Sequence, residues 1–148
     1  MRYVLDTNIL LHYLRESPLS VWIDAHYNPL DAGSNEAIIS VVSIGEIKAI
    51  AKINRWGQKR LKNIELLCEE LLITDINTED LLERYAELDA FSQGKLIDHP
   101  LKISSRNMGK NDLWIAATAS ILNAILLTTD QDFNHLHQEF LNLEYIRV

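Results

Sequence analysis

A chain of 148 residues, 47% of them hydrophobic, is long enough for one ordinary domain with a substantial core, and this composition argues against disorder. No apolar run approaches the roughly 20 residues of a membrane span, and a strand pattern follows Met1-Arg2 with no signal-peptide core, so we expect a cytoplasmic protein. The formal charge of −7 argues against phosphate binding over the whole surface, and one cysteine excludes an intrachain disulfide.

Apolar residues recur at strand or helix spacing along the whole chain. In chain order we expect a strand over 3–5, helices over 7–14 and 19–27, a loop over 28–36, a strand over 37–41, helices over 43–55 and 58–71, a strand over 72–74, a long helix after Asn77-Thr78, an irregular segment over 93–110, a helix over 111–122 and strands over 124–128 and 143–148. Ser43 to Glu46 has the pattern of a capping box that opens the third helix. Cys68 belongs to the apolar series of the fourth helix, which favours a core position over a reactive one.

Strands that alternate with helices over the full length predict a three-layer α/β/α sandwich with a mainly parallel central sheet, as a single domain over 1–148. The helix over 111–122 has almost no polar face, so it should be buried, and 143–148 should form an edge strand. In such sheets ligands bind beyond the carboxyl ends of the strands. Functional side chains are therefore expected at that edge.

Four acidic residues fall at strand ends or helix starts: Asp6, Glu46, Asp112 and Asp130. Each has a structural explanation, because Asp6 and Asp112 could cap helices, Glu46 could complete the capping box and Asp130 could begin a turn. Four carboxylates in one pocket, however, would repel one another unless a cation lay between them. Hard oxygen ligands of this kind suit Mg²⁺ or Mn²⁺, which could activate water and stabilise the leaving oxygen of a phosphodiester. The pattern therefore predicts a nuclease.

Four segments carry a family resemblance: LDTNILL (5–11), SIGEI (43–47), NDLWIAATA (111–119) and LLTTDQDF (126–133). In this order they resemble the PIN-domain ribonucleases, and in particular the VapC-type toxins of bacterial toxin–antitoxin pairs. The resemblance spans nearly the whole chain. It implies a PIN-like α/β/α nuclease domain whose acidic cluster binds Mg²⁺ or Mn²⁺ and hydrolyses single-stranded or structured RNA.

The resemblance also implies a role for individual residues. Asp6 and Asp112 correspond to the principal metal ligands, Glu46 to a second-site or water-bridged ligand that orients the attacking water, and Asp130 completes the cluster. The residues that would position ligands, water or phosphate are Thr7, Asn8, Asn111 and Thr128. Asp132 could join the cluster or instead cap a helix that opens at Phe133. In-line attack by a metal-activated water would leave a 5′-phosphate and a 3′-hydroxyl.

Basic residues are concentrated in two segments, 48–62 and 95–110, while 65–89 is strongly acidic. A protein of negative net charge must supply its affinity for RNA locally. The candidates for contact with the RNA backbone are Arg55, Lys59, Lys102, Arg106 and Lys110. Solvated helix faces are the alternative explanation of such charge runs.

The family resemblance further implies a small antitoxin partner, which docks near the acidic pocket, and a homodimer. Two other functions compete with a nuclease. An aspartyl-phosphate enzyme would need a second Asp two residues after Asp6, where this chain has Asn8. A catalytically inactive PIN-like module that binds RNA or protein would tolerate loss of acids, and all four are present. His135 and His137 are expected at the surface, Trp114 in the core and Trp56 exposed.

Overall fold

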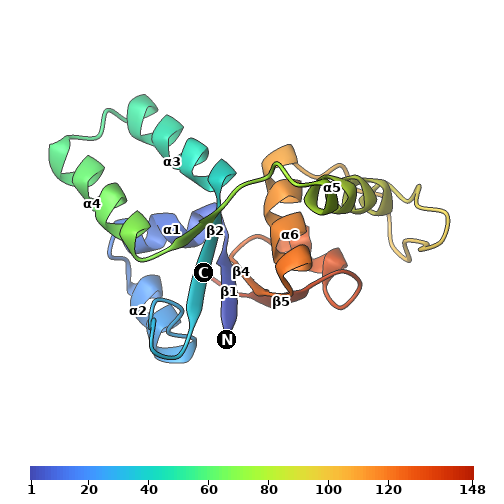
Figure 1. Ribbon diagram of the computed structural model, residues 1–148, viewed down its shortest axis with the longest axis horizontal. Helices are drawn as coiled ribbons and strands as arrows, with labels where there is room; N and C mark the ends of the chain where they lie inside the picture. The colour runs from blue at the N-terminus through green and yellow to red at the C-terminus, as the bar shows by residue number, and fades with distance from the viewer.

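Five parallel strands form the centre of the fold, and the computed structural model describes all of residues 1–148. The strands are β1 (Arg2–Leu5), β2 (Glu36–Ser40), β3 (Leu72–Thr74), β4 (Ile125–Thr128) and β5 (Asn142–Tyr145). They lie in the order β3-β2-β1-β4-β5, and every neighbouring pair is parallel. The chain moves outward from β1 first toward β3 and later, on the other side, toward β5 (Figure 1). The switch point of the sheet therefore lies between β1 and β4, where the fold favours a ligand site.

Helices cover both faces of this sheet (Figure 1). They are α1 (Thr7–Leu14), α2 (Pro18–His26), α3 (Val41–Ile53), α4 (Gln58–Glu69), α5 (Glu79–Ser92), α6 (Lys110–Leu122) and a short 3₁₀ helix, η1 (Gln131–Leu136). The first four lie on one side and α5 and α6 on the other. This arrangement confirms the predicted three-layer α/β/α sandwich. None of the helices combines the length and the apolar character that crossing a membrane requires.

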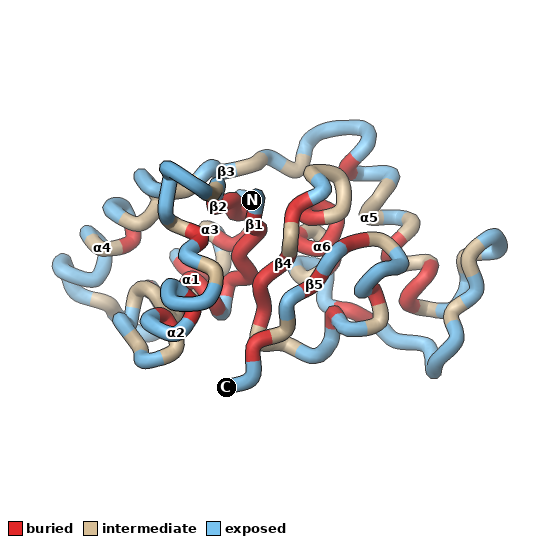
Figure 2. The backbone as a smooth tube through the Cα atoms, turned by 90° about the horizontal axis from the view of Figure 1, so that it is seen from below, coloured by how far each residue is buried: buried red, intermediate tan, exposed pale blue.

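Two hydrophobic cores fill the spaces between the layers, and β1 shows how the sequence divides them. Val4 faces the core beneath α5 and α6, whereas Tyr3 and Leu5 face the core beneath α1 to α4. Alternate residues of a strand point to opposite faces, so a strand buried on both sides is apolar throughout. Figure 2 shows β1 and β4 side by side in the middle of the molecule, and every residue of each strand after the first is buried. Cys68 was expected in the core; it is half-buried and packs against the margin of the core beneath α1 to α4.

Two predicted boundaries shift in the structure. β2 runs directly into α3, so the helix begins at Val41 with Ser40 as its N-cap, and the Oγ of Ser40 accepts a hydrogen bond from the N–H of Val42 at 3.3 Å. The predicted capping box is therefore wrong, because Ser43 already lies inside the first turn. The last strand ends at Tyr145 rather than at the chain end.

The segment between α5 and α6 is irregular, as predicted, but several contacts hold it in place. The N–H of Arg106 donates to the carbonyl of Ser92 at 2.6 Å, which ties the end of the segment back to α5. His99 Nε2 lies 2.5 Å from a carboxylate oxygen of Glu139, and its ring stacks on Phe140. These contacts tie the segment to the end of α5 and to the residues that follow η1.

Histidine and tryptophan positions differ in part from expectation. His135 is half-buried, with Nε2 2.7 Å from the Oγ of Ser92, so its predicted surface position is wrong; His137 is exposed, as predicted. Trp56 is half-buried against the core beneath α1 to α4 instead of exposed. Trp114 is half-buried and stacks on Tyr85, with ring centroids 4.0 Å apart.

Candidate active site

The four predicted acids approach the switch point from four different elements. Asp6 directly follows β1, and its N–H donates to the carbonyl of Leu127 in β4 at 3.1 Å, which fixes it between the two central strands. Asp130 lies two residues beyond β4, while Glu46 comes from α3 and Asp112 from the first turn of α6. Because the strands are parallel, their carboxyl ends meet at one edge of the sheet, and α6 begins at the same edge.

Asp6 is the most enclosed of the four, with only 4% of its surface exposed. One carboxylate oxygen accepts the N–H of Thr7 at 2.7 Å, and the other accepts the hydroxyl of Thr128 at 2.7 Å. Burial raises the pKa of Asp6 to about 6; these two hydrogen bonds oppose the rise, and the charges of Asp130 and Glu46 add to it. Asp6 is the N-cap of α1, but the capping hydrogen bond does not neutralise its buried charge.

Two threonines connect the acids to one another. Thr7 is buried, and its Oγ1 lies 2.8 Å from a carboxylate oxygen of Glu46, so its backbone and side chain bridge Asp6 and Glu46. Thr128 is also buried; besides donating to Asp6, its Oγ1 accepts the N–H of Asp130 at 3.0 Å. The two hydroxyls thus tie three acids from three elements to the ends of β1 and β4.

Asp130 and Asp132 differ from each other in their surroundings. A carboxylate oxygen of Asp130 accepts the N–H of Asp132 at 2.9 Å, which makes Asp130 the N-cap of η1. Asp132 is exposed in the first turn of that helix, so the alternative in which it caps a helix that opens at Phe133 is wrong. Helix η1 begins at Gln131, because Asp130 supplies the capping oxygen two residues earlier than expected.

Asp112 is half-buried, and the charge of every other acid of the site affects its pKa. Burial raises its pKa to about 7, and the negative charges of Asp6, Asp130, Glu46 and Asp132 raise it further, in that order. The ion pairs of the protein lie elsewhere, so no Lys or Arg side chain neutralises these carboxylates. A buried negative charge without a basic partner is the environment that a cation would stabilise.

The donor set agrees with a hard divalent cation, since carboxylate and hydroxyl oxygens are the ligands that Mg²⁺ and Mn²⁺ prefer. The side chains do not converge: no group of three or more Asp, Glu, His or Cys side chains is arranged so that it could hold a metal ion. Repulsion among these acids adds to the rise in the pKa values of Asp6 and Asp112. The types of residue and their shared edge of the sheet, rather than a set of converging ligands, are the features that fit a divalent cation.

The remaining predicted positions divide into buried and exposed residues. Asn8 and Asn111 lie on the first turns of α1 and α6, next to Asp6 and Asp112 in sequence, and both are exposed. Ser43 was interpreted as a helix cap, yet it is completely buried and its Oγ lies 2.9 Å from Thr7 Oγ1. Only the structure reveals this contact, because the two residues are 36 positions apart.

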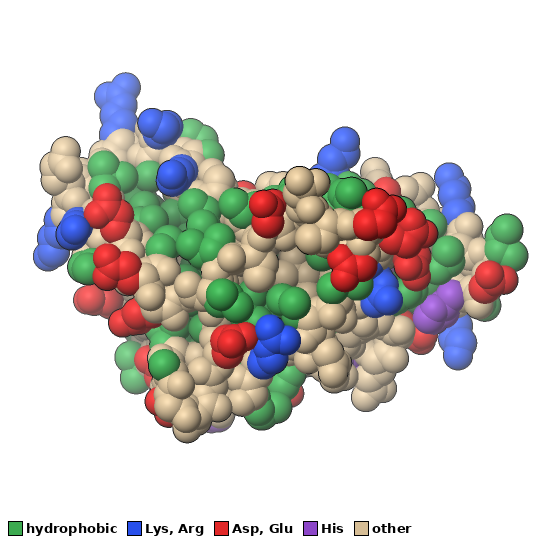
Figure 3. All heavy atoms as spheres, viewed as in Figure 1, with side chains coloured by type: hydrophobic (Ala, Val, Ile, Leu, Met, Phe, Trp, Pro, Cys, Tyr) green, Lys and Arg blue, Asp and Glu red, His purple; other side chains and the backbone are tan.

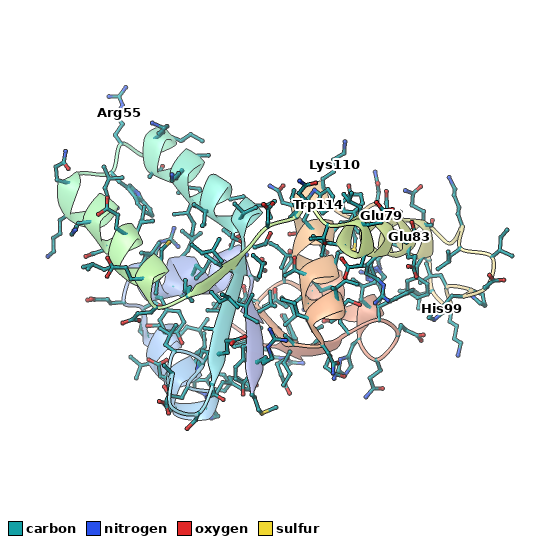
Figure 4. All side chains as sticks on the ribbon, in the orientation of Figure 1. Arg55, Glu79, Glu83, His99, Lys110 and Trp114 are labelled. Carbon is teal, nitrogen blue, oxygen red and sulfur yellow. The ribbon has the colours of Figure 1, made fainter.

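The predicted RNA-binding residues form two groups, all of them exposed. Lys102 and Arg106 lie on the segment before α6, and Lys110 is the first residue of that helix. Arg106 and Asp132 line the same cavity of about 130 Å³, which places Arg106 beside the start of η1. Arg55 and Lys59 instead belong to the α3–α4 hairpin, and Figure 4 shows Arg55 extending from its tip. In Figure 3 the surface dips between this hairpin and the α5–α6 side of the molecule.

Comparison with known proteins agrees with this geometry. The PIN domain family model matches residues 3–138. Ribonuclease VapC1 of Haemophilus influenzae strain R2866 is 29% identical over 128 residues, which cover 86% of each chain. The structure of VapBC2 from Rickettsia felis bound to a DNA fragment from its promoter matches 98% of each chain at 25% identity with a TM-score of 0.77. The structure of VapBC-1 from nontypeable H. influenzae matches 98% of each chain at 24% identity with a TM-score of 0.72. With a family match over most of the chain and acids at the edge of a PIN-like sheet, this protein belongs to the PIN domain family.

Proposed function

We propose that the protein is a ribonuclease and the toxin of a VapBC-type toxin–antitoxin pair. The observation that carries the proposal is the group of four acids at the switch point, which lacks a basic partner and in which two buried threonines connect Asp6, Glu46 and Asp130. The relatives agree with it, since the curated ones carry the name Ribonuclease VapC1 and solved ones are VapBC complexes. A PIN-like module without turnover is not favoured, because every acid of the cluster is retained.

PIN-domain ribonucleases are generally dependent on a divalent metal. We propose Mg²⁺ or Mn²⁺ as the cofactor, held by Asp6, Glu46, Asp112 and Asp130. When bound, such an ion lowers the pKa of a water molecule and stabilises the negative charge that develops on the leaving oxygen. It would also offset the repulsion that raises the pKa values of Asp6 and Asp112.

The side chains of the site would have different roles in the reaction. Asp6 is held at both oxygens and so keeps a fixed position, whereas the second oxygen of Glu46 remains available to orient the attacking water. The exposed amides of Asn8 and Asn111 can donate to a phosphate oxygen beside the acids. In-line attack at phosphorus then leaves a 5′-phosphate and a 3′-hydroxyl, with no covalent enzyme intermediate.

RNA has to be held next to a strongly negative site. We propose that Lys102, Arg106 and Lys110 contact its backbone beside the acids, and that Arg55 and Lys59 provide a second contact from the α3–α4 hairpin. Contacts of this kind position the substrate without reading its sequence.

We further propose a small antitoxin that covers the acidic site, a homodimer and a cytoplasmic location, where the RNA is found. The solved relatives include VapBC bound to promoter DNA, which is the assembly that we expect for this chain and its antitoxin. An adjoining gene for a small DNA-binding protein, and growth arrest when this chain is expressed alone, would separate a toxin from a housekeeping nuclease.

The activity itself is tested with a panel of RNAs incubated with Mg²⁺ or Mn²⁺. Wild-type protein should cleave at least one RNA, and Asp6→Asn and Asp112→Asn should not. Asp98→Asn, an exposed acid before α6, is the matched control and should cleave normally. No cleavage with any divalent metal would favour the binding module, and cleavage that survives both substitutions would locate the activity elsewhere.

A further inference from the structure

Ser43 occupies an unusual position for a serine. It lies in the first turn of α3, is completely buried, and its Oγ is 2.9 Å from the Oγ1 of Thr7. Ser40, three residues earlier, caps the same helix, so Ser43 is not needed for that purpose. A buried hydroxyl is costly unless it forms a hydrogen bond, and the bond that Ser43 forms is directed at the acidic site.

The number of protons determines the direction of these hydrogen bonds. The Oγ1 of Thr7 lies within hydrogen-bond distance of both Ser43 and Glu46, but a hydroxyl has one proton to donate. A carboxylate can only accept, so the Thr7 hydroxyl must donate to Glu46. Ser43 must then donate to Thr7, and a directed chain runs from Ser43 through Thr7 to Glu46.

Thr7 is also the residue that joins two acids. Its N–H donates to Asp6 at 2.7 Å, and its hydroxyl lies 2.8 Å from Glu46. The rotation of the Thr7 side chain therefore decides where the carboxylate of Glu46 lies relative to Asp6. A donor on α3 that occupies a free lone pair of Thr7 Oγ1 restricts this rotation.

We infer that Ser43 is a positioning residue of the active site, which fixes the Thr7 hydroxyl and thereby sets the spacing between Asp6 and Glu46. The inference rests on the proposed metal-dependent function. Ser43 touches neither substrate nor metal and acts only through Thr7. Groups that orient metal ligands in this way typically contribute 10- to 100-fold to metal affinity.

A double-mutant cycle tests this action through Thr7. Mn²⁺ binding to the full-length protein is measured by electron paramagnetic resonance for wild type, Ser43→Ala, Thr7→Val and the double variant. Ser43→Ala should weaken Mn²⁺ binding roughly tenfold in the wild-type background and have almost no effect in the Thr7→Val background. Equal losses in both backgrounds, or no loss in either, would overturn the inference.

Ser40→Ala is the matched control, because it also removes a buried hydroxyl from the start of α3. It should lower the melting temperature through loss of the cap while leaving Mn²⁺ affinity unchanged. Ser43→Thr retains the hydroxyl and should restore affinity. A loss of affinity in Ser40→Ala as large as that in Ser43→Ala would mean that Ser43 is merely structural.

A readout without metal separates this inference from the proposed function. In metal-free protein, the ¹³C shift of the Glu46 carboxylate should change in Ser43→Ala and not in Ser40→Ala. If wild-type protein binds no Mn²⁺, the proposed metal site fails, and this shift still decides whether Ser43 acts on Glu46. An unchanged shift in Ser43→Ala would overturn the inference.

Discussion

Asp6→Asn should separate the observed role of Asp6 as a helix cap from its proposed role as a metal ligand. Asn is nearly isosteric, and its side-chain oxygen can still accept the N–H of Thr7, so the cap remains. What disappears is a buried negative charge. We therefore expect the metal-free variant to fold and to be at least as stable as wild type at pH 7, while it loses its affinity for Mn²⁺.

The magnitude follows from the pKa of Asp6. Its rise from 3.8 to about 6 corresponds to roughly 3 kcal/mol of free energy of unfolding. Because the raised pKa means that the folded state holds the proton more tightly, wild type should lose this stability as the pH rises from about 4 to about 6. The Asn variant has no such loss, so it should gain up to about 3 kcal/mol over wild type at pH 7 and nothing at pH 4. The Thr128 hydroxyl loses the carboxylate oxygen to which it donates, and this loss reduces that gain.

Urea unfolding with EDTA at pH 4 and pH 7 measures this difference, and Asp98→Asn serves as the control for an exposed acid. A second set of unfolding curves with Mn²⁺ should show stabilisation of wild type and none of Asp6→Asn. An Asn variant that unfolds, or that is clearly less stable than wild type at pH 7, would refute the reasoning. It would show that Asp6 serves mainly to cap α1.

Three further variants test other parts of the account. Thr128→Val removes the hydroxyl that donates a hydrogen bond to Asp6, so Mn²⁺ affinity measured by paramagnetic resonance should fall roughly tenfold. Unchanged affinity would contradict the role of Thr128 as a bridge between the acids. Charge reversal at both Arg106 and Lys110 should weaken RNA binding and flatten its salt dependence in filter-binding assays, whereas reversal at Lys95 should do neither. His99→Ala removes a hydrogen bond and a stacked ring that hold the segment before α6, so trypsin should cleave this segment faster than in wild type. An equal cleavage rate would mean that other contacts anchor it.

The fold could be predicted from the sequence because its signals are local and repeated. Apolar strands such as 3–5 and 124–128, separated by helices, require a parallel sheet covered on both faces, and the structure has that sheet. The acids could be placed at one edge for the same reason, since each follows a strand or begins a helix. The parallel sheet brings those positions together, because all of its strands end at the same edge.

What the sequence could not provide are contacts between residues far apart in the chain. Ser43 and Glu46 have the spacing of a capping box, and nothing local indicates that Ser43 would face Thr7. His135 was expected at the surface because its partner, Ser92, lies 43 residues away. Trp56 likewise packs on a core assembled from distant helices. Such errors arise where tertiary contacts, rather than local pattern, decide the environment.

The chemistry of the cleaved RNA ends tests the central claim most directly. If the acids bind a divalent metal and activate water, the downstream fragment carries a 5′-phosphate and the upstream fragment a 3′-hydroxyl. Treating the products with a phosphate-dependent exonuclease and with a 3′-ligase distinguishes these ends on a single labelled RNA. We predict a 5′-phosphate and a 3′-hydroxyl whose formation EDTA abolishes. A 2′,3′-cyclic phosphate with a 5′-hydroxyl would contradict the account, because those ends arise from attack by the ribose 2′-hydroxyl instead of water.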